Sequence, residues 1–577
     1  MTAIGIDFGT TNSVAAVATA QGTRVIRIDT PPHEWADLGF DRVLPSVVNV
    51  GPDRQLSFGW AAKTANEGDK FEAIKRLFAA EEISTVGDNE FFVEEIAAAI
   101  FRHIRQRIIS EGTDFSSAMI TVPANSRGLA RYRTKVCAGL GGIEPLGLIN
   151  EPTAAAMAYS RRQIVDDQTI LVFDFGGGTL DCTLLETREG MFFEQASRGI
   201  RRLGGVDFDN AILSAVAGET AGSETWSRSD KSRLKMAIEM AKIRLSDSDL
   251  GETTVVVPDV LSGYRLTRPR FDEITRPLVE RSRTVIEKVL GELRMKGSDI
   301  DVLLLVGGTS KVPAVRQFVS ELLGVAPATG VDPMTAIAEG AAIAAGIQTG
   351  ELQDNDFFVS TEHALGTVTL DPIARTLRFS PVIPRNQKLP AKTTETFYPV
   401  TDNQQSVLVT VIEGDPDKPL THEENQILTE FEVPFDPPRP MSAAGFDLTF
   451  SYDTDGLLHV DIVDAMSGKK MSERVTVSFK GAAGGAELVG MANRVRMMVD
   501  TGTVTAGPTS DAGLDHRDAR SLDLATKANS KVIPFLEPDD SAKIRQLVET
   551  MNAAGDSELQ AAQDALEAIL RKYSYLL

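Results

Sequence analysis

Two segments of the chain place an aspartate, glycines and threonine hydroxyls at the end of an apolar run. Ile4–Ser13 reads IGIDFGTTNS and Leu171–Asp181 reads LVFDFGGGTLD. In each we expect a strand followed by a tight glycine turn, whose backbone N–H groups and hydroxyls can face an anion. An aspartate at the end of such a strand can hold the waters that Mg²⁺ retains in protein sites. Gly307-Gly308, after the apolar run Val302–Val306, repeats the pattern. The sequence therefore predicts duplicated halves that close on a nucleotide.

Ordinary hairpins, a P-loop and a dinucleotide-binding loop fit these glycine turns less well. One strand followed by Asp-x-Gly is more often a hairpin, but two near copies and a third glycine pair make coincidence improbable. The chain lacks the GxxxxGK[ST] pattern of a P-loop. Gly139–Gly142 resembles a dinucleotide-binding loop, but Glu144 stands where the third glycine should be, and a helical stretch precedes it. We reject that interpretation.

Composition narrows the class of protein. With 59 basic and 81 acidic residues the chain carries a formal net charge of −22. Such a surface repels phosphate backbones and anionic lipids, so we expect no nucleic-acid or membrane partner. Only two cysteines occur, and the six histidines show no metal-binding spacing, which fits a reducing compartment without a transition metal. We see no signal-peptide pattern and no membrane-length apolar run, and we therefore expect a cytoplasmic protein.

The chain is long enough for two to four domains. Residues 1–350 alternate β-branched runs with amphipathic stretches, which predicts an α/β domain. An acidic bridge at 351–361 leads to residues 362–480, where alternating runs predict a β-sandwich. Residues 485–577 end in helical patterns. The clearest expected strands are Ala3–Asp7, Ser117–Val122, Thr169–Asp174, Asp301–Val306, Ser406–Ile412, Phe446–Tyr452, Leu457–Val463 and Arg474–Phe479. The clearest expected helices are Val93–Ser110, Ser229–Leu245 and Phe271–Arg294.

Five segments occur in the order found in the DnaK-type heat-shock protein 70 chaperone family. They are the two phosphate turns, Ile149–Ala156 (INEPTAAA), Leu203–Phe208 (LGGVDF) and Leu305–Pro313 (LVGGTSKVP), and Asp455–Val460 (DGLLHV) adds a match in the β-rich part. The chain is thus similar to this family over nearly its whole length, most specifically in the ATPase part and weakly beyond about residue 485. The resemblance implies an actin-like ATPase of two duplicated lobes, a β-sandwich that binds extended peptide, and a helical lid.

The resemblance assigns roles residue by residue. Lys75, in FEAIKRL, would lie beside the γ-phosphate of ATP and the attacking water; a lone helix lysine is usually solvated, but this context reverses that preference. Glu151 and Asp174 would orient the water, with Thr179 near the γ-phosphate. Mg²⁺ would be organised through water by Asp7 and Asp181. The residues assigned to ATP or ADP are Asp7, Gly9, Thr10, Thr11, Gly176, Gly177, Gly178, Asp181, Gly204, Gly205, Glu239, Lys242, Ser246, Gly307, Gly308 and Lys311. Many family members carry arginine in place of Lys311, so adenine stacking should be weaker here.

A peptide site follows from the same resemblance. A β-domain can hold extended peptide by backbone hydrogen bonds and one apolar pocket. Val407 and Val409 alternate on one face of their strand and would line the pocket, with Phe446 opposite, and Leu370 and Val400 would form an arch. The competing interpretation is that such valines are simply sandwich core.

Several departures point to altered coupling between the two activities. Gly147 replaces the basic residue that J-domain co-chaperones contact in the family, and the linker reads Asn355–Val359 (NDFFV) rather than a leucine-rich run. Asn125 replaces an aromatic residue, while the switch pair Pro123 and Arg131 is retained. We expect unfolded polypeptides as partners, together with a J-domain protein and a nucleotide exchange factor. The alternatives are a chaperone-like adaptor that binds ATP with little turnover, or a small-molecule kinase or filament protein of the actin-like superfamily; the last two should lack the β-rich segment.

Overall fold

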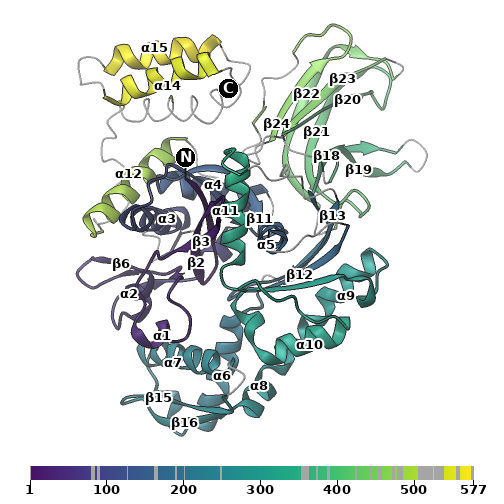
Figure 1. The fold of residues 1–577 in the computed structure, drawn as a ribbon. Helices are drawn as coiled ribbons and strands as arrows, with labels where there is room; N and C mark the ends of the chain where they lie inside the picture. The colour runs from purple at the N-terminus through teal and green to yellow at the C-terminus, as the bar shows by residue number, and fades with distance from the viewer. Residues whose placement is uncertain are drawn as a thin grey trace.

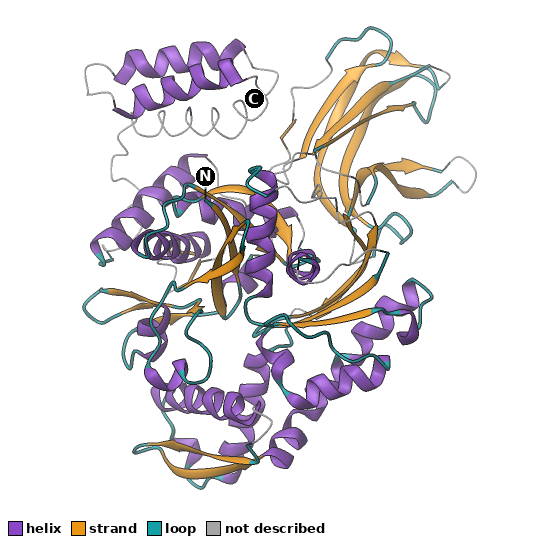
Figure 2. Ribbon diagram, viewed as in Figure 1, coloured by secondary structure: helices purple, strands orange, loops and turns teal. Residues whose placement is uncertain are grey.

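The fold is that of a computed structural model of the whole chain. It describes residues 2–572 except 79–84, 87–90, 127, 162–166, 189–190, 201, 247–249, 353–360, 362, 372–374, 386, 388–389, 423–424, 442, 453–457, 471–474, 477–484, 505–523, 525–537 and 554–558. A mixed α/β part comes first, two β-sheets follow, and helices end the chain (Figures 1 and 2). Among the described residues no helix is both long and apolar enough to cross a membrane.

The first lobe is built on a sheet of order β11-β10-β1-β2-β3, with β4 paired to β2. Strand β1 runs parallel to β10 and antiparallel to β2. Its run AIGIDF is buried on both faces, as expected for a strand covered by helices on either side. The elements of this lobe are β1 (Ala3–Phe8), β2 (Asn12–Thr19), β3 (Gly22–Ile26), α1 (His33–Ala36), β4 (Leu44–Pro45), β5 (Val48–Val50), β6 (Leu56–Phe58), α2 (Gly59–Thr64), β7 (Asp69–Phe71), η1 (Ile74–Leu77), β8 (Thr85–Val86), β9 (Phe91–Phe92), α3 (Val93–Ser110), β10 (Ser117–Val122), α4 (Gly128–Leu140), β11 (Glu144–Asn150) and α5 (Glu151–Ser160).

The second lobe repeats this arrangement with the order β14-β13-β12-β17. Strand β12 is antiparallel to β13 and parallel to β17. In the first lobe, β1 is likewise antiparallel to β2 and parallel to β10. The predicted duplication is therefore seen in the strands that carry the two phosphate turns. The elements are β12 (Thr169–Phe175), β13 (Leu180–Arg188), β14 (Met191–Ile200), α6 (Gly205–Glu219), η2 (Ser223–Thr225), α7 (Arg228–Ser246), β15 (Glu252–Val257), β16 (Leu261–Thr267), α8 (Arg268–Arg281), α9 (Arg283–Glu292), η3 (Gly297–Asp299), β17 (Val302–Val306), η4 (Gly308–Lys311), α10 (Pro313–Leu323) and α11 (Ala336–Gln348).

Helix α11 joins the lobes although it comes late in the sequence. It packs on α5 and on β1 and β2 of the first lobe, and its alanine-rich side chains are buried there. The approach is close enough to require glycine, because a Cβ at Gly340 would lie 1.7 Å from the Ala154 carbonyl oxygen. A Cβ at Gly5 would lie 2.1 Å from the Ala342 nitrogen. The two halves therefore meet at a seam of small residues.

Two four-stranded antiparallel sheets follow the second lobe, in the orders β19-β18-β21-β22 and β20-β23-β24-β25. Buried side chains from both sheets form one apolar cluster that includes Val411, Val433, Phe450 and Val460. The strands are β18 (Ala364–Leu370), β19 (Leu377–Ile383), β20 (Ala391–Phe397), β21 (Gln404–Gly414), β22 (Gln426–Arg439), β23 (Phe446–Tyr452), β24 (Leu458–Asp464) and β25 (Val475–Thr476).

The C-terminal helices pack in two separate places. Helix α12 (Gly485–Thr501) packs on α3 of the first lobe, where Val495, Met498 and Val499 join the core of that lobe. The Arg102 guanidinium donates to Asp500 at 2.8 Å and 2.5 Å. Beyond α12, Val504 N–H donates to the Arg54 carbonyl at 2.8 Å. Helices α14 (Pro538–Ala553) and α15 (Leu559–Lys572) form a separate pair with its own small core.

Most predicted elements are confirmed within one or two residues. Of the predicted strand Arg474–Phe479 only Val475–Thr476 lie within the described residues, as β25. Phe271–Arg294, expected as one helix, is found as α8 and α9. The break falls at Ser282, whose buried hydroxyl donates to the Val279 carbonyl at 2.6 Å. Such back-bonding bends helices. The linker at residues 355–359 lies outside the described residues.

Candidate active site

A cavity of about 740 Å³ opens between the two lobes. Residues of both phosphate turns line it, together with residues of α6, α7 and the turn after β17. Many of the residues assigned to nucleotide from the sequence are thus brought together. The predicted nucleotide residues that line the cavity are Thr10, Thr11, Gly177, Gly205, Glu239, Lys242, Ser246, Gly308 and Lys311.

The two phosphate turns touch each other at the base of the cavity. A Cβ at Gly177 would lie 1.9 Å from Thr11 Oγ1, and one at Gly178 would lie 2.5 Å from Thr10 Cγ2. Gly307 has φ +79°, and a Cβ there would lie 2.6 Å from Asp174 Oδ1. Glycine is therefore required where the turns meet, because any side chain would occupy the space between them.

The remaining predicted glycines shape these turns. A Cβ at Gly9 would lie 2.2 Å from the Asn12 carbonyl oxygen. Gly176 N–H donates to the Thr179 carbonyl at 3.1 Å, and Gly205 N–H donates to the Gly176 carbonyl at 3.1 Å. Gly204 precedes α6 and approaches Gly177 so closely that a Cβ would lie 2.4 Å from its carbonyl carbon. The turn after β12 is thereby fixed to the start of α6.

Lys75 and Glu151 form a buried ion pair beneath the turns. The distance from Lys75 Nζ to Glu151 Oε1 is 2.7 Å, and the side chains are only 8% and 9% exposed. Glu151 opens α5, where the helix dipole favours a negative charge. Lys75 lies in η1, which the left-handed residue Ala73 introduces. Two segments 76 residues apart thus place one cation and one carboxylate at the same point.

Three further carboxylates surround this pair. Burial, followed by the charge of Glu151, raises the pKa of Asp7 to about 6. The same two causes raise the pKa of Asp181 to about 7. Burial and the charges of Glu151 and its neighbouring aspartates also hold the pKa of Asp174 well above its usual range. The site concentrates more negative charge than the single ammonium of Lys75 offsets.

Neighbouring polar groups hold these carboxylates in place. Thr121 Oγ1 donates to Asp7 Oδ1 at 2.8 Å, and Asn125 Nδ2 donates to Asp181 Oδ1 at 2.6 Å. Arg76 donates to the Gly178 carbonyl. None of these three contacts was predicted. Only Asn125 carried a signal in the sequence, as a departure from the aromatic residue usual in the family.

The far end of the cavity carries Glu239 and Lys242, two of the residues assigned to ATP or ADP. Lys242 Nζ pairs with Asp209 at 2.8 Å and also donates to the Gly205 carbonyl at 3.1 Å. Glu239 is bound from the opposite lobe, because Lys63 Nζ lies 2.7 Å from its Oε2. Lys63 was missed in the sequence, where nothing links it to a residue 176 positions later. It closes the cavity across the two lobes.

The predicted peptide residues do not share one environment. Val409 and Phe446 are 2% and 4% exposed and lie in the core between the sheets. Val407 is half-buried against the same core. Leu370 and Val400 are 39% and 49% exposed. The structure thus leaves Val407, Leu370 and Val400 accessible, whereas Val409 and Phe446 occupy positions that sandwich core explains.

Position 147 does not lie where the sequence suggested. We expected a surface position that had lost a cation, but Gly147 is buried in β11, and a Cβ there would be 3.5 Å from Met119 Sδ and 3.6 Å from Gln348 Oε1. The expectation that Gly147 is itself a surface residue is wrong. At this position β11 lies against Met119 of β10 and against Gln348 at the end of α11, whose Nε2 also donates to the Leu146 carbonyl at 2.8 Å.

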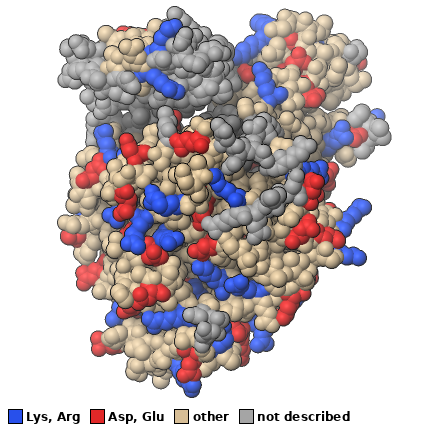
Figure 3. Space-filling model, in the orientation of Figure 1, with Lys and Arg blue, Asp and Glu red and all other residues tan. Residues whose placement is uncertain are grey.

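Charge elsewhere on the molecule is mixed. On the face in Figure 3, Lys and Arg side chains are interspersed with Asp and Glu rather than gathered into one basic surface. Among the described residues no group of three or more His, Cys, Asp or Glu side chains is arranged to hold a metal ion directly.

Comparison with known proteins identifies the relationship. The family model described as Hsp70 protein matches residues 79–574. The protein named Chaperone protein DnaK from Thermoplasma acidophilum is 36% identical over 83% of this chain and 78% of its own length. The proteins of that name from Mycoplasmopsis agalactiae and Thermotoga petrophila are 34% and 35% identical, over 83% and 82% of this chain and 79% and 80% of theirs. With its duplicated lobes, which fit an actin-like ATPase, and this similarity over most of its length, the chain belongs to the Hsp70 family.

Proposed function

We propose that this Hsp70-family protein is a molecular chaperone that uses ATP binding and hydrolysis to control its grip on extended apolar peptide. The observation that supports the ATPase activity is the buried Lys75–Glu151 pair with three aspartates around it. Lys75 lines a smaller cavity, which shares Thr10 with the cavity between the duplicated lobes. Phosphoryl transfer to water requires mainly positioning and charge neutralisation. This arrangement offers both.

Each side chain has a role in that reaction. The ammonium of Lys75 stabilises charge on the γ-phosphate, and Glu151 and Asp174 orient the attacking water. Thr179 and Thr10, which both line a smaller cavity of about 160 Å³ beside Lys75, hold the phosphoryl group. Thr11 and the N–H groups of the turns bind the remaining phosphates. These interactions are stronger in a site from which water is excluded than they are in bulk solvent.

The carboxylates fit Mg²⁺ as the cofactor. Four carboxylates around one ammonium, with the pKa values of Asp7, Asp174 and Asp181 raised, form a site that a cation would stabilise. Mg²⁺ prefers oxygen ligands and keeps several waters, so Asp7 and Asp181 would hold it through water. When bound, it would neutralise phosphate charge. Thr121 and Asn125 each donate to one oxygen of these carboxylates.

The paired sheets formed by β18–β25 are the proposed peptide-binding β-sandwich. Val407 is the best candidate for the floor of the pocket because it is half-buried beside the core. Leu370 and Val400 are exposed apolar side chains and would contact the peptide from above. Peptide would be held by backbone hydrogen bonds and by burial of one apolar side chain. Val409 and Phe446 would support the pocket from within the core.

A contact between the β-sheets and the first lobe supports coupling of the two activities. Glu413 of β21 accepts a hydrogen bond from Gly128 N–H, the first residue of α4, at 3.3 Å. A carboxylate at this end of the helix is favoured by its dipole. Gln426, the register partner of Glu413 on β22, lines the smaller cavity that also contacts Lys75. The loop end of this hairpin therefore reaches the cavity that Lys75 lines.

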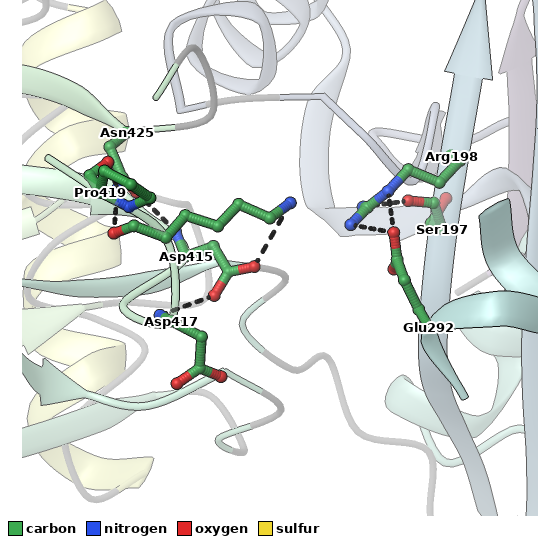
Figure 4. Close-up of polar contacts among 8 residues, drawn as sticks. Ser197, Arg198, Glu292, Asp415, Asp417, Pro419 and Asn425 are labelled. Carbon is green, nitrogen blue, oxygen red and sulfur yellow. Dashed lines mark hydrogen bonds and ion pairs between the residues drawn. The ribbon is translucent and has the colours of Figure 1, made fainter. Parts of the chain in front are cut away.

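Polar contacts join the two ends of the loop between β21 and β22. Asp415 N–H donates to Asn425 Oδ1 at 2.8 Å, and Asn425 Nδ2 donates to the Pro419 carbonyl at 2.9 Å (Figure 4). Lys418 pairs with Asp415 at 3.5 Å. A change at the ATPase lobe can thus be transmitted through Glu413 and Gln426 into the strand that carries Val407.

The position of α12 indicates which state the structure represents. Helix α12 is anchored on α3 by Arg102–Asp500 and by an Arg494–Glu95 pair at 3.1 Å. As part of the proposed lid, α12 is therefore held away from the β-sheets. We propose that this is the peptide-releasing arrangement and that the lid closes after hydrolysis.

Partners and compartment follow from the same proposal. Unfolded polypeptides are the substrates, a nucleotide exchange factor would open the cleft, and the protein would act in the cytoplasm. A J-domain protein is the proposed stimulator of hydrolysis, but its contact would not be made through position 147, because Gly147 is buried in β11.

Release of a fluorescent apolar peptide with and without ATP tests the function. ATP should speed release at least tenfold, and single-turnover hydrolysis should occur on the same protein. Peptide binding with ATP binding but no turnover would indicate an adaptor instead. Loss of both activities would refute the chaperone proposal. A small-molecule kinase is disfavoured by the eight described strands after α11.

A further inference from the structure

The segment between β3 and β4 contributes an aromatic cluster beside the nucleotide cavity. The Trp35 ring lies 5.7 Å from that of Phe40 and 4.8 Å from that of Trp60. Phe40 also meets Trp60 edge to face at 6.2 Å. Trp35 and Trp60 are 2% and 1% exposed, whereas Phe40 is half-buried. Such tilted and edge-to-face contacts are the favoured geometries of aromatic pairs, so the cluster is well packed.

Trp60 fixes both ends of this segment. Its backbone N–H donates to Asp29 Oδ2 at 2.8 Å, and its indole N–H donates to the Val43 carbonyl at 3.1 Å. Between these points Gly39 adopts φ +82° after α1, and Phe40 N–H donates to the Trp35 carbonyl at 3.1 Å. The segment from Asp29 to Val43 is therefore a loop whose two ends are both hydrogen-bonded to Trp60.

The cluster also positions the bridge between the lobes. Lys63 Nζ lies 4.8 Å from the centroid of the Trp35 ring and 5.6 Å from that of Trp60. From this position the ammonium pairs with Glu239 of α7. A cation over an indole face is stabilised by the ring quadrupole. The loop thus supports the first-lobe side of the bridge to Glu239.

Leu38 and Phe40 extend from this loop to the cavity itself. Both line it together with Glu239, Lys242 and Ser246 of α7 (α1 and α7 lie close together in Figure 1). The phosphate turns occupy the other end of the same cavity. A nucleotide whose phosphates lie on the turns would place its nucleoside between α7 and the two apolar side chains.

We propose that the loop Asp29–Val43 is a gate on nucleotide release, in which Leu38 and Phe40 form an apolar wall against the nucleoside of ATP or ADP. The inference rests on the proposed ATP site and adds a first-lobe wall to it. Release of nucleotide requires the wall to move, and the cluster of Trp35, Phe40 and Trp60 resists that movement. The gate therefore sets how long ADP stays bound after hydrolysis.

Release of tritiated ADP, chased with excess unlabelled ADP, tests the gate. Phe40→Ala should release ADP about tenfold faster than the wild type, which corresponds to about 1.4 kcal/mol. Leu38→Ala should act in the same direction and serves if Phe40→Ala does not fold. Phe318→Ala, which removes a half-buried aromatic ring of α10 that does not line the cavity, should release ADP at the wild-type rate.

Tryptophan fluorescence gives a second measurement. The chain has three tryptophans, so Trp226→Phe leaves only Trp35 and Trp60, and ADP should change their emission. Unchanged emission, or release from Phe40→Ala and Leu38→Ala at the wild-type rate, would overturn the gate. Failure of the wild-type protein to bind ADP in equilibrium dialysis would instead refute the proposed ATP site.

Discussion

Replacing Lys75 separates its structural role from its catalytic role. Lys75→Met removes the ammonium but keeps an unbranched side chain of similar length. The Lys75–Glu151 pair is buried, with exposed fractions of 8% and 9%, so the substitution leaves Glu151 as an unpaired buried charge. Breaking such a pair costs about 3–5 kcal/mol. Chemical denaturation of the nucleotide-free protein should show a loss of unfolding free energy of that size.

The catalytic effect should persist when the stability loss is corrected. Adding Glu151→Gln to Lys75→Met removes the unpaired charge and should restore most of the unfolding free energy. Hydrolysis should remain slow, because the double variant lacks both the ammonium of Lys75 and the Glu151 carboxylate that orients the water. Loss of one charge-stabilising donor alone costs about 10²–10³ in rate. Single-turnover release of phosphate from ATP measures this step without peptide or co-chaperones.

The comparison of the two variants decides the role of Lys75. Affinity for ATP should change little, since the cavity residues Thr11, Glu239 and Lys242 remain. If Lys75→Met hydrolyses ATP within threefold of the wild-type rate, Lys75 has no part in the chemistry. If the double variant regains both stability and hydrolysis, the lysine is purely structural.

Three further predictions test other parts of the molecule. Val407→Phe should weaken peptide binding by about 1–3 kcal/mol through overpacking, measured by fluorescence anisotropy, whereas Leu408→Phe, at a neighbouring position that is 58% exposed, should bind normally; equal binding by both would place the pocket elsewhere. The pKa values of Asp7 and Asp181 are raised to about 6 and about 7 from 3.8, so the folded protein holds more protons than the unfolded chain between about pH 4 and pH 7. Without Mg²⁺ and nucleotide its unfolding free energy should therefore fall as pH rises through this window, and a rise would show that these carboxylates are ionised throughout. Asp500→Ala should loosen α12 from α3 by about 0.5–1 kcal/mol, seen as faster amide hydrogen exchange in α12; unchanged exchange would mean that apolar contacts alone hold it.

Local sequence patterns predicted many of the strands, helices and turns of the fold. The apolar run Ser117–Val122 and the amphipathic run Val93–Ser110 became β10 and α3 with the predicted bounds, because their periodicity reflects burial on one or both faces. The repeated Asp-x-Gly segments likewise predicted equivalent turns. These features depend on neighbouring residues, so the sequence could reveal them.

Contacts between distant segments could not be predicted in this way. Nothing near Lys63 indicates that it pairs with Glu239, and nothing near Asp500 indicates Arg102. Both pairs depend on the packing of whole elements. The burial of Gly147 has the same origin, since α11 covers the end of β11 near Gln348. The replacement of a basic residue by Gly147 singled out this position in the sequence, but it gave no information about the residues that surround it.

The place of α11 in the chain also constrains how the protein is made. The face of β1 that contains Gly5 is covered by Ala342, a residue that leaves the ribosome more than three hundred residues later. At a translation rate of about 5–20 residues per second, that face stays uncovered for roughly 17–70 s until Ala342 has been synthesised. During translation the first lobe therefore presents an apolar sheet surface of the kind that chaperones bind. A nascent copy of this protein would itself need the protection that the finished molecule is proposed to give.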